Sequence, residues 1–297
     1  MTIKKDKNKL VFNVLGTVLI SFFSLACFLP FLLIVIASFT SEKSIITNGY
    51  SFYIPKGAFS LEGYLYVLKD PTTIFRAYGV TILVTALGTL GAVFMAIMTG
   101  YVLSRKDFPW NNKLSFFFFF TTLFNGGLVP WYLLCTNVLG FTDRIYALIL
   151  PGLFSVWNMI IAKNFMKSIP NEIIESGKID GGGDFKIFYT LVVPLCKPLV
   201  ATLGLFTALS YWNDWFTSLL FIKSNELFGL QYLLQNILNS AEAVKRVAQL
   251  SGLDLKQMPM ESMKMAMLIV TTGPMVLLYP FLQKYFVKGL TVGAIKG

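Results

Sequence analysis

Six long apolar stretches constrain the fold of this 297-residue chain more than any other feature. About 20 residues of helix cross a hydrocarbon core that is roughly 30 Å thick, and each stretch is long enough to do so. The first stretch is longer than a removable signal peptide and lacks a small-residue cleavage site, so we expect it to be retained. The sequence therefore predicts an all-α, polytopic membrane protein with six transmembrane helices, at about 11–39, 75–103, 114–136, 145–166, 195–221 and 263–284.

Lysine and arginine are concentrated in three of the polar segments, and such residues in short loops mark the cytoplasmic side. These segments precede the first stretch, follow the second and follow the sixth. We therefore expect both termini in the cytoplasm and residues 40–74, 137–144 and 223–262 outside. The formal net charge of +10 fits membrane topology and attraction to anionic lipid better than nucleic-acid binding.

Cysteine and histidine usage excludes several classes of chemistry. The three cysteines, Cys27, Cys135 and Cys196, are isolated in or beside apolar stretches, where we expect them to be small buried hydrophobes. The chain has no histidine, so nucleophilic pairs with histidine and histidine-ligated metal sites are excluded. The glycine-rich run at 181–186 lacks the Gly-Lys-Ser/Thr of a phosphate-binding loop. We predict no catalytic, metal or cofactor site, and any ATP that drives the protein must bind another subunit.

The polar segment between the fourth and fifth stretches predicts a short helix. Ser168 is placed to cap it, and Pro170 is tolerated in a first turn. Glu172 and Glu175 lie near its positive N-terminal end, and the glycines at 181–183 should end it. With the expected topology, this helix lies at the cytoplasmic face.

This helix has an apolar face and an acidic face. Ile169, Ile173 and Gly177 recur at four-residue spacing, whereas Glu172 and Glu175 project elsewhere. Two readings are open, a docking helix for a protein partner and an amphipathic connector that rests on lipid headgroups. A lipid-bound helix would carry a lysine-rich polar face. Here acidic residues balance the lysines, which favours a protein partner.

The spacing of residues in this segment resembles a known motif. Glu175-Ser176-Gly177, Gly181 and Leu191-Val192-Val193-Pro194 fit the pattern E-A-A-x-x-x-G followed by I-x-L-P, which is typical of the ATPase-docking loop of ABC import permeases. Ser176 and Gly177 stand where alanine is usual, and Leu191 and Val193 also depart from the pattern. Gly177 should weaken the helix by about 1 kcal/mol relative to alanine.

The resemblance extends from about residue 75 to the end of the chain. The C-terminal run Tyr279–Gly297, the run Tyr101–Arg105 and the loop Ser168–Pro198 are similar to maltose-type carbohydrate permeases. Gly126–Leu134 resembles the branch of lipoprotein-like permeases for complex oligosaccharides.

This resemblance implies a type I ABC importer permease fold in a bacterial plasma membrane. It also implies a second homologous permease, an ATPase dimer that binds ATP and Mg, an extracellular solute-binding protein, and an oligosaccharide carried by alternating access. The permease itself would be a transport subunit, not an enzyme. The residues that the resemblance assigns to ATPase docking are Glu172, Glu175, Ser176, Gly177, Asp180, Gly181 and Pro194.

A polar and aromatic cluster near the end of the fifth stretch is the candidate substrate pathway. It comprises Tyr211, Trp212, Asn213, Asp214 and Trp215. An ionisable group such as Asp214 is costly within a membrane unless it faces water, a partner or a ligand. Aromatic rings stack on sugars, but tryptophan and tyrosine also mark membrane interfaces. Sugar contact, an interface belt and contact with the second permease are all open, and Asn125 in the third stretch invites the same reading.

The expected domain organisation follows from the topology. Residues 1–10 form a cytoplasmic segment, 11–74 the first span with an external loop, 75–287 the permease core with the docking loop 168–190, and 288–297 a cytoplasmic tail. In the external segment, leucine and isoleucine between positions 230 and 238 recur at helical spacing, which predicts an amphipathic helix.

Two other functions are weighed against an ATP-driven importer. An ion-coupled secondary carrier for a small polar solute needs ionisable groups in mid-membrane, and Asp214 is almost alone there. A membrane enzyme acting on lipid-linked sugars needs an acid/base pair that faces the membrane surface. The sequence offers no such pair outside the docking loop.

Overall fold

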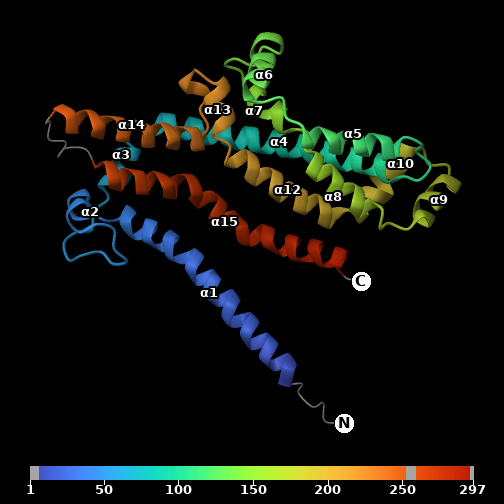
Figure 1. The fold of residues 1–297 in the computed structure, drawn as a ribbon, viewed down its shortest axis with the longest axis horizontal. Coiled ribbons are helices and arrows are strands. Elements are labelled where there is room, and N and C mark those ends of the chain that lie inside the picture. The colour runs from blue at the N-terminus through green and yellow to red at the C-terminus, as the bar shows by residue number, and fades with distance from the viewer. Residues whose placement is uncertain (1–6, 252–258, 295–297) are drawn as a thin grey trace. The chain divides into compact units, whose positions relative to one another are not determined.

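The computed structural model describes residues 7–251 and 259–294, which are helical with short connections (Figure 1). These ranges contain no strand, and their only β-type pairing is an isolated bridge between Thr40 and Phe59. The predicted all-α class is confirmed. The helices are α1 (Lys7–Ser38), α2 (Glu42–Asn48), α3 (Glu62–Val67), α4 (Pro71–Ser104), α5 (Asn111–Leu123), α6 (Leu128–Leu133), η1 (Leu134–Val138), α7 (Tyr146–Ile149), η2 (Leu150–Gly152), α8 (Val156–Met166), α9 (Asn171–Ile179), α10 (Asp184–Ile187), η3 (Phe188–Val192), α11 (Val193–Leu195), α12 (Lys197–Trp212), α13 (Phe216–Phe221), η4 (Asn225–Leu227), α14 (Leu230–Ser251) and α15 (Met260–Ala294).

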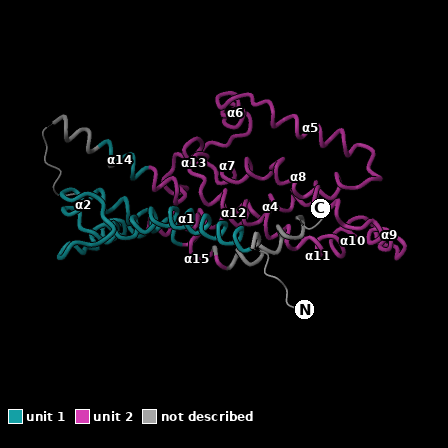
Figure 2. Tube along the Cα trace, turned by 60° about the horizontal axis from the view of Figure 1, so that its bottom comes forward, with its two compact units in different colours: residues 1–71, 236–273 teal, residues 72–235, 274–297 magenta. Residues whose placement is uncertain are grey.

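The chain divides into two compact units, coloured separately in Figure 2. Unit 1 contains residues 1–71 and 236–273, and unit 2 contains residues 72–235 and 274–297. The helices α14 and α15 each begin in one unit and end in the other. The domain boundaries expected from the sequence concern membrane topology and stay predictions.

Among the described residues, three helices are individually long and apolar enough to cross a membrane. They are the apolar parts of α1, α4 and α15, at Leu10–Ser38, Pro71–Ser104 and Met260–Leu278. Three further pairs of helices are apolar enough together, but each pair is bent. If each bent pair counts as one span, the described residues contain up to six spans. The pairs are Asn111–Leu123 with Leu128–Val138 at 112°, Tyr146–Gly152 with Val156–Met166 at 47°, and Asp184–Leu195 with Lys197–Trp212 at 80°.

The third predicted span is not one straight helix. Its break contains Gly127, which has a φ of 89°, a left-handed value that glycine adopts without strain. The Asn125 side-chain oxygen accepts a hydrogen bond from the Gly127 N–H at 2.8 Å, which fixes the turn. The helix axis therefore turns by 112° where composition alone suggested a continuous apolar helix.

Within unit 1, a carboxylate from α2 caps the start of α15. One oxygen of Glu42 accepts the Glu261 N–H at 3.0 Å, and the other accepts the Ser262 N–H at 2.9 Å. A negative charge at this position satisfies unpaired N–H groups and complements the helix dipole. The Tyr50 hydroxyl donates to the Glu261 carboxylate at 2.9 Å. These contacts join α2, the loop after it and the start of α15.

The cysteine prediction is right in two of three cases. Cys135 and Cys196 are buried, but Cys27 is exposed. Cys27 lies in α1, and the rest of the described chain buries none of the most apolar stretch of that helix. Apolar sequence there reflects a membrane environment instead of an internal core.

The main core of unit 2 joins α4, α8, η3 and α12. Its buried side chains include Ile97, Ala162, Phe188 and Leu203. At Gly100, a Cβ atom would lie 2.6 Å from the Cβ of Ala162, so this glycine lets α4 and α8 approach closely. Because η3 belongs to the core, the segment that follows α9 is anchored to the spans.

The predicted amphipathic helix is present as α14. Leu230 is fully buried and packs in a cluster with Ala77 and Trp212. Its N–H donates to the Thr81 hydroxyl at 2.9 Å, which ties the start of α14 to α4. The placement of α14 outside the membrane stays a prediction.

Candidate functional site

The predicted docking helix is α9, which lies next to α10 at one end of unit 2 (Figures 1 and 2). It has Glu172 in its first turn, as predicted, but Pro170 directly precedes the helix instead of lying in that turn. The predicted cap at Ser168 is wrong, because the Ser168 hydroxyl donates to the Phe165 carbonyl at 2.7 Å. Ser168 still belongs to the turn that closes α8, where its N–H also donates to Phe165. Its side chain therefore serves the preceding helix.

The C-terminus of α9 has the geometry of a Schellman motif. The Gly182 N–H donates to the Gly177 carbonyl at 2.9 Å, and the Gly181 N–H donates to the Lys178 carbonyl at 3.0 Å. Gly181 has a φ of 75°, the left-handed conformation that this motif requires. The prediction that these glycines end the helix is confirmed, and Gly181 has a specific conformational role.

Gly177 packs directly against the segment that follows α9. It is buried, and a Cβ atom there would lie 2.9 Å from Leu191 Cδ1 and 3.0 Å from Ile187 Cγ1. The position at which this chain departs from the alanine of the docking pattern is therefore a close helix contact. It holds α9 against α10 and η3.

The other predicted docking residues are exposed. Four lie on or at the end of α9, and Pro194 lies in α11, at the 80° bend that leads into α12. The four are Glu172, Glu175, Ser176 and Asp180. Their exposure leaves an acidic surface on α9 open to a partner, while Gly177 faces inward.

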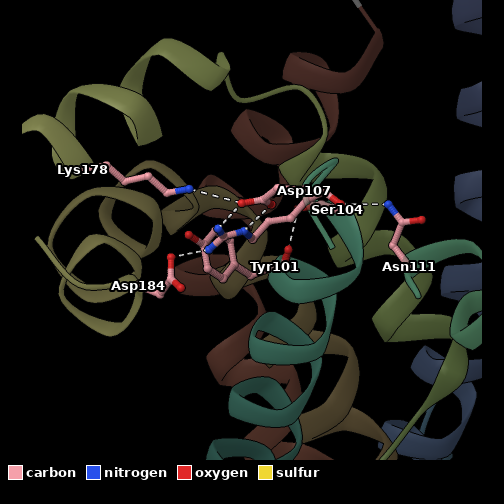
Figure 3. Close-up of polar contacts among 7 residues, drawn as sticks. Tyr101, Ser104, Asp107, Asn111, Lys178 and Asp184 are labelled. Atoms are coloured by element: carbon pink, nitrogen blue, oxygen red, sulfur yellow. Dashed lines mark hydrogen bonds and ion pairs between the residues drawn. The ribbon is translucent and has the colours of Figure 1, made fainter. Parts of the chain in front are cut away.

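A network of charged side chains links α9 and α10 to the loop after α4 (Figure 3). The Arg105 Nε donates to Asp107 Oδ1 at 2.8 Å, its Nη2 donates to the second oxygen, and its Nη1 donates to Asp184. Lys178, on α9, donates to Asp107 at 3.2 Å. Arg105 and Asp184 are 79 positions apart in sequence. In the sequence, Arg105 is a marker of topology and part of the run Tyr101–Arg105 that carries the family resemblance, and no pattern along the chain pairs it with Asp184.

The network keeps its charges over a wide pH range. Hydrogen bonding to Asp107 raises the pKa of Arg105 further above its usual range, against an opposing effect of burial. Hydrogen bonding from Arg105, with a smaller contribution from Lys178, holds the pKa of Asp107 well below its usual range. The Arg105 side chain is only 14% exposed, whereas Asp107 and Asp184 are 53% and 64% exposed, so the ion pairs are shielded from solvent on the arginine side alone.

Two residues of the predicted substrate cluster, Tyr211 and Trp212, are buried packing residues. The Tyr211 ring lies in the space left by two glycines, because Cβ atoms at Gly88 and Gly152 would lie 2.4 Å and 2.8 Å from the ring carbon Cζ. Its hydroxyl donates to the Ile149 carbonyl at 2.7 Å. Tyr211 therefore fixes α12 against α4 and η2.

The other predicted pathway residues are spread over separate surroundings. Asn213 is exposed and accepts a hydrogen bond from Gln231, and Trp215 is exposed with its ring edge-on to Phe216. Asp214 accepts the Thr217 N–H at 3.0 Å, at the start of α13. The structure does not gather Asn125 with this group, since its side chain fixes the break in the third span.

A cavity of about 340 Å³ lies beside α7, η2, α8, α12 and α13. Its lining contains a single acidic residue, Asp214, and no basic residue. The Asn158 amide donates to the Thr207 hydroxyl at 3.2 Å across the cavity wall. Apart from Asp214, these polar groups escaped sequence reasoning, because isolated serine, threonine and asparagine residues in an apolar span give no strong signal. Besides Tyr211, the polar lining residues are Ser155, Asn158, Thr207, Ser210, Asp214 and Thr217.

A helical membrane protein with a short, capped helix held out between two spans has the architecture of an ABC importer permease subunit. Residues 92–292 match the family described as binding-protein-dependent transport system inner membrane component, and the chain belongs to that family. This membership confirms a membrane-spanning transport subunit, which is not an enzyme and works with a separate ATPase.

Curated relatives agree over nearly the full length. The polygalacturonan/rhamnogalacturonan transport system permease protein YtcP of Bacillus subtilis is 36% identical, over 98% of this chain and all of that protein. Protein LplC of the same organism is 35% identical, over all of this chain and 98% of that protein. The resemblance to carbohydrate importer permeases inferred from the sequence is confirmed.

A solved structure supports the fold. A chain of a bacterial ABC transporter involved in the import of the acidic polysaccharide alginate matches with a TM-score of 0.79 and 26% identity. The match covers 96% of this chain and all of that chain. The predicted type I importer permease fold is therefore confirmed.

Proposed function

We propose that this chain is one of two permease subunits of an ATP-driven importer for oligosaccharides, and that α9 is its ATPase-docking helix. The observation that carries the proposal is the combination of an exposed acidic surface on α9 with a rigid attachment beneath it. Glu172 and Glu175 are exposed, whereas Gly177 is packed on Ile187 and Leu191. A helix that receives force from a partner needs both properties.

The proposed mechanism places α9 and both chain termini in the cytoplasm. One subunit of an ATPase dimer binds α9, and the other subunit binds the equivalent helix of the second permease. ATP and Mg bind only the ATPases. When these close, α9 moves and carries α10, η3 and α11 with it, which rotates α12 at the bend beside Pro194 and rocks the spans from inward-open to outward-open. A solute-binding protein delivers the cargo from outside.

The proposed cargo is an oligosaccharide. Relatives named for polygalacturonan/rhamnogalacturonan and for arabinooligosaccharides support this class. The cavity beside α8 and α12 also suits sugar hydroxyls, since hydroxyl and amide side chains line it around Asp214. The cluster from Tyr211 to Trp215 would contribute mainly through Asp214, because Tyr211 and Trp212 are committed to packing.

An ion-coupled carrier receives less support. Such a carrier needs several ionisable groups along its pathway. Asp214 is the only acidic or basic residue among those that line this cavity, and one of its oxygens already caps α13. The family match also places this chain with transport systems that use a binding protein.

The test is affinity purification of the chain from native membranes in mild detergent, with mass spectrometry of bound proteins. The parent chain should retain an ATPase and a second permease, whereas Glu175→Lys should retain the permease but lose the ATPase. Glu62→Lys, which reverses an exposed charge on α3, is the matched control and should retain both. Retention of the ATPase by well-expressed Glu175→Lys and by a deletion of 176–181 would refute the docking role.

A further inference from the structure

The docking helix has a second connection to the spans besides the chain itself. Along the chain, α9 continues through α10, η3 and α11 into α12. We infer that Arg105 is a positioning residue that makes span α4 move together with the docking helix when the ATPases close. This inference rests on the proposed docking role of α9.

All the donor nitrogens of the Arg105 guanidinium take part in the connection. Nε and Nη2 form a fork on the two oxygens of Asp107, and Nη1 reaches Asp184. Planar, bidentate pairs of this kind fix orientation as well as distance. A lysine could not hold both carboxylates in the same way.

The two carboxylates lead to different parts of the docking loop. Asp184 is in the first turn of α10, so Arg105 binds that helix directly. Asp107 accepts from Lys178 in the last turn of α9, so the docking helix is joined through one intermediate side chain. Figure 3 shows Lys178 and Asp184 approaching the end of α4 from separate helices.

Arg105 is firmly attached to α4. Its guanidinium carbon lies 5.7 Å from the centre of the Tyr101 ring, and that ring packs on Phe188 with the centroids 5.1 Å apart. The Asn111 amide donates to the Arg105 carbonyl at 2.8 Å, which fixes the backbone on the other side. A pull on α9 or α10 therefore reaches α4 through Arg105, the least exposed side chain of the network.

Fluorescent reporters on two spans can separate this role from general stabilisation. In a cysteine-free background, Ala86→Cys places a reporter on α4 and Ala208→Cys places one on α12. Each labelled chain is purified with its second permease and ATPases, and the emission shift on adding ATP and vanadate is recorded. In the parent, both reporters should shift. With Arg105→Gln, the α12 shift should persist and most of the α4 shift should be lost.

Several variants make the result specific. Lys106→Gln removes a neighbouring positive charge, leaves both Arg105 ion pairs in place, and should keep both shifts. Asp184→Asn and Lys178→Gln each cut one arm and should lower only the α4 shift. If Arg105→Gln does not assemble, Arg105→Lys retains the charge without the fork and should show the same selective loss.

Two fluorescence results would overturn the inference about Arg105. Equal retention of both shifts in the Arg105 variants overturns the inference, because α4 would then move without the network. Loss of both shifts with the ATPases still bound also overturns it, because the network would only maintain the docking loop. If the parent itself retains no ATPase, the proposed docking function fails instead, and that result is read from the purification before any fluorescence is measured.

Discussion

The backbone N–H of Gly182 donates to the carbonyl oxygen of Gly177, so that the end of α9 is tied to the residue through which α9 packs on its neighbours. The same glycine therefore takes part in both the cap and the close contact with Ile187 and Leu191. The position and the end of the docking helix are set together. This coupling leads to two predictions about the glycines.

Gly181→Ala should destabilise the end of α9. Its φ of 75° costs a non-glycine residue roughly 1–2 kcal/mol. Gly183→Ala is the matched control, because Gly183 has a φ of −69° and open space around it. Hydrogen exchange of the α9 amides should accelerate in the first variant and not in the second. Equal exchange in the two variants would contradict the role of the cap.

Gly177→Ala should lower stability despite a better helix propensity. Alanine gains about 1 kcal/mol in a helix, but its Cβ would press on Ile187, which is fully packed in the core. Ser176→Ala, at an exposed neighbouring position, removes no such contact and serves as the control. Thermal unfolding in detergent measures both. A rise in Tm for Gly177→Ala would show that Leu191 and Ile187 yield easily.

Much of the helix α9 could be predicted from the chain because its signals are local. Acidic residues in the first turn and glycines after the last are separated by a few positions, and each acts on the backbone beside it. The predicted cap at Ser168 is wrong for the same reason. Ser168 lies between two helices, and its hydroxyl binds a carbonyl of α8 instead of an N–H of α9. Local patterns identify candidates for a cap, but the competing geometry decides between them.

Long-range pairings could not be predicted. Arg105 looked like a topology marker because lysine and arginine both fit that role, whereas its partner Asp184 is distant in sequence. The cavity beside Asn158 and Thr207 also depends on where α8 and α12 meet. The number of apolar stretches was predictable from length and composition, yet the bend at Gly127 was masked by the apolar residues on both sides.

Gly88→Ala should be strongly destabilising, because the new Cβ would overlap the Tyr211 ring, which is buried. Overpacking of this kind typically costs about 1–3 kcal/mol. Gly79→Ala in the same helix meets no atom within 4 Å and should be neutral or stabilising by up to about 1 kcal/mol. The comparison requires only Tm values of the two purified variants. Similar Tm values would mean that α12 can shift away from α4.

Glu42→Gln should weaken the attachment of α15 within unit 1. The charged carboxylate accepts two N–H bonds at the helix start, and charge-assisted bonds contribute about 1.5–3 kcal/mol each when buried, less where solvent reaches them. Glu62→Gln changes an acidic residue in the first turn of α3 and is the control. Limited proteolysis between α2 and α3 should become faster only in Glu42→Gln. Unchanged cleavage would show that the cap is dispensable.

The Arg105 network should be insensitive to pH near neutrality. The pKa of Asp107 in the folded chain is held below its ordinary 3.8, so its contribution to stability is fully present above that value and is lost as pH falls through the lower, folded-state pKa. The Tm difference between the parent and Asp107→Asn should therefore stay constant between about pH 5 and pH 9 and shrink in stronger acid. A difference that changes between about pH 6 and pH 8 would point to another titrating group.

The fit of the Tyr211 ring between Gly88 and Gly152 has an evolutionary consequence. Three positions on separate helices share one volume, so no one of them can change size alone without leaving a void or a clash. Among related sequences, replacement of the tyrosine by a small residue should be accompanied by a larger residue at position 88 or 152, whereas phenylalanine should be accepted with both glycines unchanged. Substitutions at the three positions should therefore covary among relatives, and the strength of that covariation reflects how closely α12 packs on α4.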